Sequence, residues 1–144
     1  AYERGRGART RLPFMLRVMA QVGATAWKGK IALLRGNWRA FGALMNENHR
    51  LVNDMMAYCG LDSAGVVATN RLIEAALDAG ALGAKLTGAG GGGSVFALVQ
   101  PGQEARMAEV LGQAARDLGL DQAIVFVPRL ARQGLVVEEG QRAP

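Results

Sequence analysis

The sequence predicts an α+β domain in which helices pack against an antiparallel sheet. Apolar residues recur at helical spacing through much of residues 13–79 and again over 103–118. Between these stretches, two strand-like runs flank a glycine-rich loop, and a further apolar run follows at Ala123–Val127. Helices followed by the order strand, loop, strand, helix, strand are typical of a layered α+β fold.

Four helices are expected, each marked by apolar periodicity and by start or stop residues. Pro13 suits the first turn of the first helix, Asp62 or Ser63 is the expected N-cap of the third, and Gly119 stops the fourth. The predicted ranges are 13–34, 38–58, about 63–79 and about 103–118.

Strands are predicted on both sides of the glycine loop and after the fourth helix. Apolar and polar residues alternate over 82–87, which is the pattern of a half-buried strand, and an apolar run follows at 94–99. A third strand is expected at Ala123–Val127, where Pro128 closes it, and Leu135–Val137 is a candidate fourth strand at an edge.

The loop between the first two strands is the most informative stretch. Five of the six residues from Gly88 to Gly93 are glycine, so any chemistry must come from backbone N–H groups. Glycine reaches positive φ easily, and successive N–H groups can then converge on an anion such as phosphate. A dinucleotide-binding loop would open a helix and a Walker loop would end in lysine, and neither follows here. The alternative is a tightly bent hairpin connection.

Composition indicates one globular domain. The chain has 144 residues, of which 50% are hydrophobic, and no apolar run approaches the length of a membrane span. Cys59 is the single cysteine, which favours a reducing cytoplasm and a role as a small buried hydrophobe. The chain starts without methionine, so we expect a processed product or a piece of a longer protein.

The net charge of +5 comes mainly from arginine, which crowds the N-terminus. Such an arm could bind nucleic acid or phosphorylated ligands, but no aromatic residues are interleaved with the arginines, and this favours a solvated linker. We expect a basic arm or linker over residues 1–12, a domain over 13–137 and a frayed tail over 138–144.

Polar residues of the second helix are the candidates for a substrate wall. Asn46, Glu47 and His49 are expected at the edge of a substrate pocket. His49 has no metal-ligand companion at helical spacing, so a surface or hydrogen-bonding role is favoured. Asn48 falls among apolar positions and should bond a neighbouring backbone group. Lys85 lies near the mouth of the loop, where a solvent-facing role is favoured.

Two stretches resemble a known family. Gly80-Ala-Leu-Gly-Ala-Lys-Leu-Thr-Gly-Ala-Gly-Gly-Gly-Gly93 is similar to the third signature of the GHMP kinases, which include galactokinase, homoserine kinase and mevalonate kinase. Leu44-Met-Asn-Glu-Asn-His49 is similar to the stretch that precedes this signature in mevalonate kinases. The resemblance covers most of residues 39–99.

This resemblance implies the ferredoxin-like C-terminal domain of a kinase that transfers the γ-phosphoryl of ATP to a small-molecule alcohol, with Mg²⁺, in isoprenoid biosynthesis. The nucleotide loop and the catalytic aspartate would belong to an N-terminal kinase domain. No catalytic or metal-binding residue is therefore assigned here, and the chain alone should be inactive. The residues implied to lie near the nucleotide phosphates are Thr87, Gly88, Ala89, Gly90, Gly91, Gly92, Gly93 and Ser94.

Two other functions stay open. The chain could be a free-standing nucleic-acid-binding module that uses its arginine arm, although no specific nucleic acid and no membrane partner is expected. It could also be a noncatalytic relative that forms a homodimer through its first helix.

Overall fold

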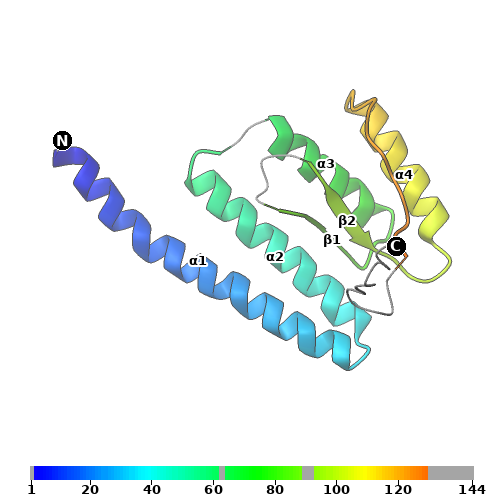
Figure 1. The fold of residues 1–144 in the computed structure, drawn as a ribbon, viewed down its shortest axis with the longest axis horizontal. Helices are drawn as coiled ribbons and strands as arrows, with labels where there is room; N and C mark the ends of the chain where they lie inside the picture. Colours follow the sequence, from blue (N-terminus) through cyan, green and yellow to red (C-terminus); the bar gives the residue numbers. More distant parts are fainter. Residues whose placement is uncertain (1, 62–63, 89–92, 130–144) are drawn as a thin grey trace, which may run out of the picture.

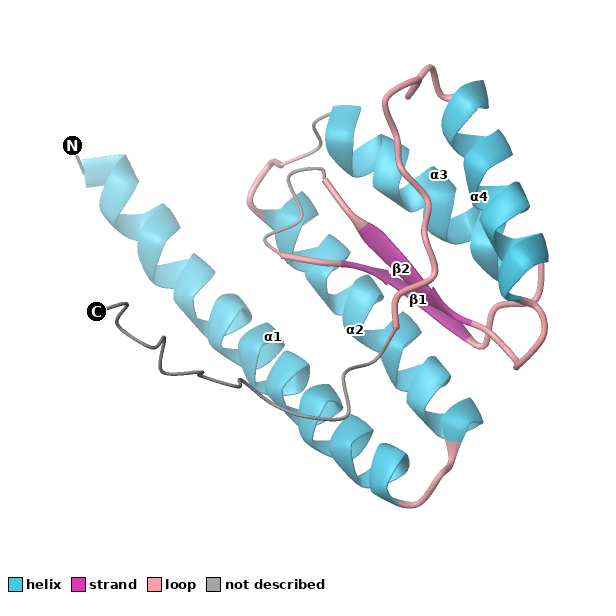
Figure 2. Cartoon of the chain, turned by 45° about the vertical axis from the view of Figure 1, so that its right-hand side comes forward, coloured by secondary structure: helices cyan, strands magenta, loops and turns pink. Residues whose placement is uncertain are grey.

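The computed structural model describes residues 2–61, 64–88 and 93–129, and it has the predicted α+β architecture. The order of elements is α1 (Tyr2–Leu34), α2 (Trp38–Tyr58), α3 (Ala64–Asp78), β1 (Gly83–Leu86), β2 (Val95–Leu98) and α4 (Glu104–Asp117). The two strands form an antiparallel hairpin. The hairpin lies between α2 on one side and α3 with α4 on the other, and α1 forms the outer edge beyond α2 (Figures 1 and 2).

Helices α1 and α2 form an antiparallel pair across a tight turn. Gly36 has a φ of 63°, and the side chain of Asn37 caps α2 by accepting a hydrogen bond from the N–H of Ala40. Between the helices, Asn48 Nδ2 donates to Thr25 Oγ1 at 2.9 Å. The amide among the apolar positions of α2 therefore bonds a side chain of α1, not the backbone group that we expected.

Helix α2 meets β1 through two glycines. A Cβ added to Gly83 would fall on the backbone of Gly42, and one added to Gly42 would fall on the backbone of Leu82. Asn46 Oδ1 accepts a hydrogen bond from the backbone N–H of Ala84 at 2.9 Å beside this contact. The absence of two side chains therefore sets the distance between α2 and the sheet.

The opposite face of the hairpin carries the hydrophobic core. Ala84 and Leu86 of β1 are 1% and 2% exposed, and they pack against α3 and α4. The other buried members of this cluster are Ile73, Ala76 and Met107. Burial of a side chain as large as that of Leu86 stabilises a fold by about 1.5–3 kcal/mol. Helices cover both faces of β1, which explains why little of that strand is exposed.

Two expectations about the ends of the chain were wrong. Helix α1 begins at Tyr2, so Pro13 lies inside the helix and not in its first turn. Ala123–Val127 forms no strand, and Ile124 and Phe126 are 84% and 74% exposed. Strand propensity alone is insufficient because a ladder needs a neighbouring strand. The predicted strand at 135–137 and the tail lie outside the described residues, as do Asp62 and Ser63.

Two smaller features complete the fold. Cys59 is exposed at the C-terminal end of α2, so the expectation of a buried cysteine was wrong. Across the described ranges, no helix is both long enough and apolar enough to span a membrane.

Candidate functional site

The β1–β2 hairpin carries the glycine loop and closes its neck with hydrogen bonds. The N–H of Thr87 donates to the carbonyl of Ser94 at 2.9 Å, and Thr87 Oγ1 lies 3.5 Å from the same oxygen. A strand follows the loop, as predicted, so the dinucleotide-binding arrangement is excluded here. Residues 89–92 of the predicted site lie outside the described residues.

Both ends of the loop need glycine for its backbone freedom. Gly88 has a φ of 71° and Gly93 a φ of 124°, which are conformations that L-residues rarely adopt. No heavy atom lies within 4 Å of the position that a Cβ would take on either glycine. The backbone conformation therefore requires glycine at both positions, and the space beside each is open.

Lys85 is the cation nearest to this neck along β1, and it is half-buried. Its Nζ donates to the carbonyl of Leu86 at 2.9 Å and lies 5.5 Å from the ring centroid of Phe96, its cross-strand neighbour. Burial lowers the pKa of Lys85. The expectation of a solvent-facing lysine was wrong, because the ammonium bonds back to its own strand and lies over an aromatic ring.

The two predicted wall residues Asn46 and Glu47 differ in environment. Asn46 is half-buried, and its amide oxygen is occupied by the N–H of Ala84. Glu47 is exposed. Asn46 therefore fixes β1 relative to α2, and Glu47 presents a carboxylate to solvent.

His49 belongs to a buried polar cluster between α2 and α3. The residue is 8% exposed, and its Nε2 lies 3.1 Å from Asn53 Nδ2, which also donates to Asn70 Oδ1 at 3.0 Å. An amide nitrogen can only donate, so Nε2 is the acceptor and the ring proton lies on Nδ1. Within the described residues, His49 Nδ1 and Asn53 Oδ1 are buried without a hydrogen-bond partner. The hydrogen-bonding role expected for His49 is observed, at a buried position.

Electrostatics oppose protonation of this histidine. Burial lowers the pKa of His49 below its ordinary value of 6.5, the nearby side-chain amide of Asn70 opposes that shift, and the positive charge of Lys85 reinforces it. A proton on Nε2 would also face the donating amide of Asn53. The groups that face the ring are thus one ammonium from β1 and two amides, from α2 and α3.

We expect the domain to lose stability as pH falls below about 6.5, because His49 resists protonation in the folded state. The folded pKa lies below the unfolded value, so the unfolded chain binds more protons and the stabilising contribution is lost as pH falls from about 6.5 through the folded pKa. Urea unfolding at about pH 7.5 and about pH 5.5, where carboxylates hardly titrate, measures the effect. The His49→Gln variant keeps an acceptor for Asn53 and should show a smaller loss. Equal losses in the two proteins would contradict this account.

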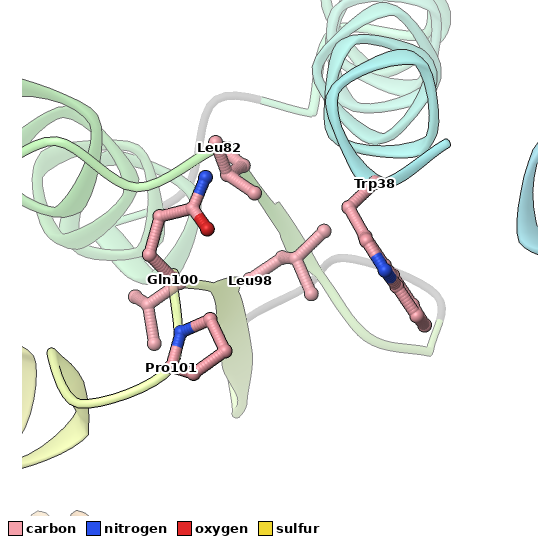
Figure 3. A pocket seen from close by; sticks show the side chains of 6 residues that line it. Trp38, Leu82, Leu98, Gln100 and Pro101 are labelled. Carbon is pink, nitrogen blue, oxygen red and sulfur yellow. The ribbon is translucent and has the colours of Figure 1, made fainter. Parts of the chain in front are cut away.

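A small pocket lies at the other end of the hairpin. It has a volume of about 200 Å³ and is lined by Trp38 of α2, by Leu82, and by the segment that ends β2 (Figure 3). The remaining lining residues are Leu98, Val99, Gln100 and Pro101. Apart from the amide of Gln100 and the indole N–H of Trp38, the side chains that line it are apolar.

Sequence reasoning missed Asn70, although a signal was present. Asn70 follows Val66 by four residues and precedes Ile73 by three, which places an amide on the buried stripe of α3. Such an amide needs a polar partner in the core.

In the described part of the chain, no group of three or more His, Cys, Asp and Glu side chains is arranged to hold a metal ion.

Comparisons with known proteins confirm the predicted family. Residues 30–117 match the family model for the C-terminal region of GHMP kinases. A mevalonate kinase of Pyrococcus horikoshii is 41% identical over 103 residues, which cover 70% of this chain and 26% of that protein. A mevalonate kinase of Pyrococcus furiosus is 33% identical over 129 residues, covering 85% and 34%. A galactokinase of Thermococcus kodakarensis is 42% identical over 89 residues, covering 60% and 22%.

The chain spans between about a fifth and a third of the length of these relatives. The matched region contains α2, α3, the hairpin and α4, which together hold the candidate site. The chain therefore belongs to the GHMP kinases, in which it corresponds to the C-terminal domain.

Proposed function

We propose that this chain forms one wall of the active site of an ATP-dependent small-molecule kinase, most similar to mevalonate kinases. The glycine loop from Thr87 to Ser94 lies beside the phosphates of ATP. An N-terminal kinase domain supplies the nucleotide loop and the catalytic aspartate. The enzyme transfers the γ-phosphoryl group to the alcohol of a small molecule in the cytoplasm.

The neck of the glycine loop is the observation that carries this proposal. Paired backbone groups hold Thr87 against Ser94, and both Gly88 and Gly93 have positive φ with open space beside them. A loop that is mostly glycine and starts from such a neck can present several N–H groups to an anion. The same end of the hairpin lies toward the start of α3 (Figures 1 and 2), where the helix dipole favours negative charge.

The fit of the two implied cofactors differs. Backbone donors suit the phosphates of ATP. The described residues offer no carboxylate cluster for Mg²⁺, so its ligands belong to the proposed N-terminal domain. Phosphoryl transfer also needs a group that orients the acceptor hydroxyl, and we assign that group to the same domain.

Asn46, Glu47 and His49 have different parts in the proposed substrate wall. The carboxylate of Glu47 is exposed and can meet the acceptor. The other two side chains bond within the domain and act by holding β1 and α3 in place relative to α2. We therefore propose Glu47 as the direct contact and the other two as positioning residues.

The 144-residue chain alone is expected to show no turnover. ATP, Mg²⁺ and either mevalonate or galactose are supplied, the two acceptors being those named for its relatives. ADP release, followed by a coupled assay, should match the buffer blank, whereas the full-length protein should phosphorylate one acceptor. Robust turnover by the chain alone would show that the catalytic groups have been misplaced. Full-length protein without turnover on small alcohols would contradict the proposed function itself.

A further inference from the structure

The ammonium of Lys85 lies beside the neck of the glycine loop. Its Nζ donates to the carbonyl of Leu86 at 2.9 Å. That carbonyl belongs to the same peptide group as the N–H of Thr87, which closes the neck by donating to the carbonyl of Ser94 at 2.9 Å. The positive charge therefore sits next to the peptide group from which the neck begins.

The same ammonium is a neighbour of the buried histidine. Strand β1 runs alongside α2 (Figure 2), and a Cβ on Gly83 would fall on the backbone of Gly42. Side chains alternate along a strand, so Lys85 projects toward α2 as well. Gly42 and His49 are seven residues apart, about two helical turns, so they lie on the same side of α2. Lys85 thus links the neck to His49, whose ring its charge affects.

This ammonium has no counter-charge within the domain. Among the described residues, no carboxylate forms an ion pair with Lys85, and the ion pairs that occur lie at exposed positions of α2 and α3. The other side chains that face the ring of His49 are the uncharged amides of Asn53 and Asn70. An anion at the neck would therefore bring a negative charge to a place where the described chain supplies only a positive one.

The cluster around His49 has an acceptor for a second ring proton. Asn53 Oδ1 is buried and has no hydrogen-bond partner within the described ranges. If the amides of Asn53 and Asn70 both turn over, Asn53 Oδ1 can accept from His49 Nε2–H and from Asn70 Nδ2. The number of hydrogen bonds in the cluster is then the same for the neutral and for the protonated ring.

We propose that an anion bound at the neck of the glycine loop binds together with a proton, which His49 takes up. This inference rests on the proposed function, in which the anion is a phosphate of ATP. The anion pairs with Lys85 and weakens the repulsion between the ammonium and a protonated ring. Because linkage is reciprocal, protonation of His49 strengthens binding of the anion by the same factor. The affinity for nucleotide therefore rises as pH falls through the folded pKa of His49, which lies below 6.5.

The test follows the ring signals of His49 by NMR in the isotope-labelled full-length protein. His49→Gln identifies these signals by their loss, and pH titrations are run without ligand and with a saturating non-hydrolysable ATP analogue and Mg²⁺. The analogue should raise the pKa of His49 by about half a unit. Between about pH 7.5 and about pH 5.5, the affinity of the original protein should rise about threefold more than that of His49→Gln. Titration of the nucleotide itself is common to both proteins.

Lys85→Met tests whether the ammonium is the link. This variant should raise the pKa of His49 in the free protein and remove most of the further rise on binding of the analogue. Lys30→Met is the matched control, because it removes the same charge from an exposed position on α1 and should leave the pKa of His49 unchanged. An unchanged pKa of His49 in Lys85→Met would overturn the inference.

The amide signals of Gly88 and Gly93 separate this inference from the proposed function. If the analogue moves both signals but leaves the pKa of His49 where it was, the inference is overturned and the proposed function stands. If the analogue binds without moving either signal, or does not bind, both are overturned.

Discussion

Replacing Gly83 with alanine is expected to destabilise the domain by about 3 kcal/mol. The added methyl group would fall on the backbone of Gly42, and backbone cannot rotate away as a side chain can. Helix α2 would have to move off β1, and the 2.9 Å hydrogen bond from Ala84 to Asn46 would be lost with that movement. Domains of this size are stable by about 5–15 kcal/mol, so the loss is a large share. Urea unfolding followed by circular dichroism measures it.

Gly23→Ala is the matched control for this substitution. It adds the same methyl group to a helical position where nothing lies within 4 Å. Alanine is favoured over glycine in a helix, so the variant should be stabilised by about 1 kcal/mol. A Gly83→Ala protein within about 0.5 kcal/mol of the original would show that the contact between the two glycines does not set the position of α2.

The second large effect is expected on catalysis. In the full-length protein, Gly88→Ala should lower kcat/KM for ATP by about a hundredfold, because an alanine at a φ of 71° would redirect the N–H groups that follow it. Steady-state kinetics with varied ATP measures the loss. The free energy of unfolding should fall by only about 1–2 kcal/mol.

Gly119→Ala separates strain from function. Gly119 has a φ of 70°, open space around its Cβ position and a place after the C-terminal end of α4. The same substitution should therefore impose a similar strain and leave kcat/KM within about twofold of the original. Equal kinetic losses in the two variants would assign the effect of Gly88→Ala to stability.

Local features of this fold were predictable from sequence. Helix α2 spans Trp38–Tyr58, as expected from its apolar period and the glycines beyond its ends. The hairpin was predicted from a period of two and from the glycine loop between the runs. In each case, the signal lies within the element itself.

Features that depend on distant contacts were not predictable. Gly42 and Gly83 are far apart in sequence. Glycine has no side chain, so no hydrophobic pattern could predict that these two residues pack against each other. Lys85 is half-buried because Phe96 lies opposite it across the ladder, and His49 is buried because α3 covers it. The predicted strand at Ala123–Val127 is the opposite case: its local pattern suits a strand, but no strand of the described ranges pairs with it. In each case, contacts with residues far away in the sequence determine the burial or the pairing.

The central claim is that the glycine loop lies against the phosphates of the nucleotide. Amide resonances of the isotope-labelled full-length protein, titrated with a non-hydrolysable ATP analogue and Mg²⁺, test it most directly. We expect the largest shifts at Thr87, Gly88, Gly93 and Ser94, with saturation at the dissociation constant of the analogue, and unchanged signals from Gly119. Saturable binding that moved other amides and left the signals of Gly88 and Gly93 in place would contradict the account.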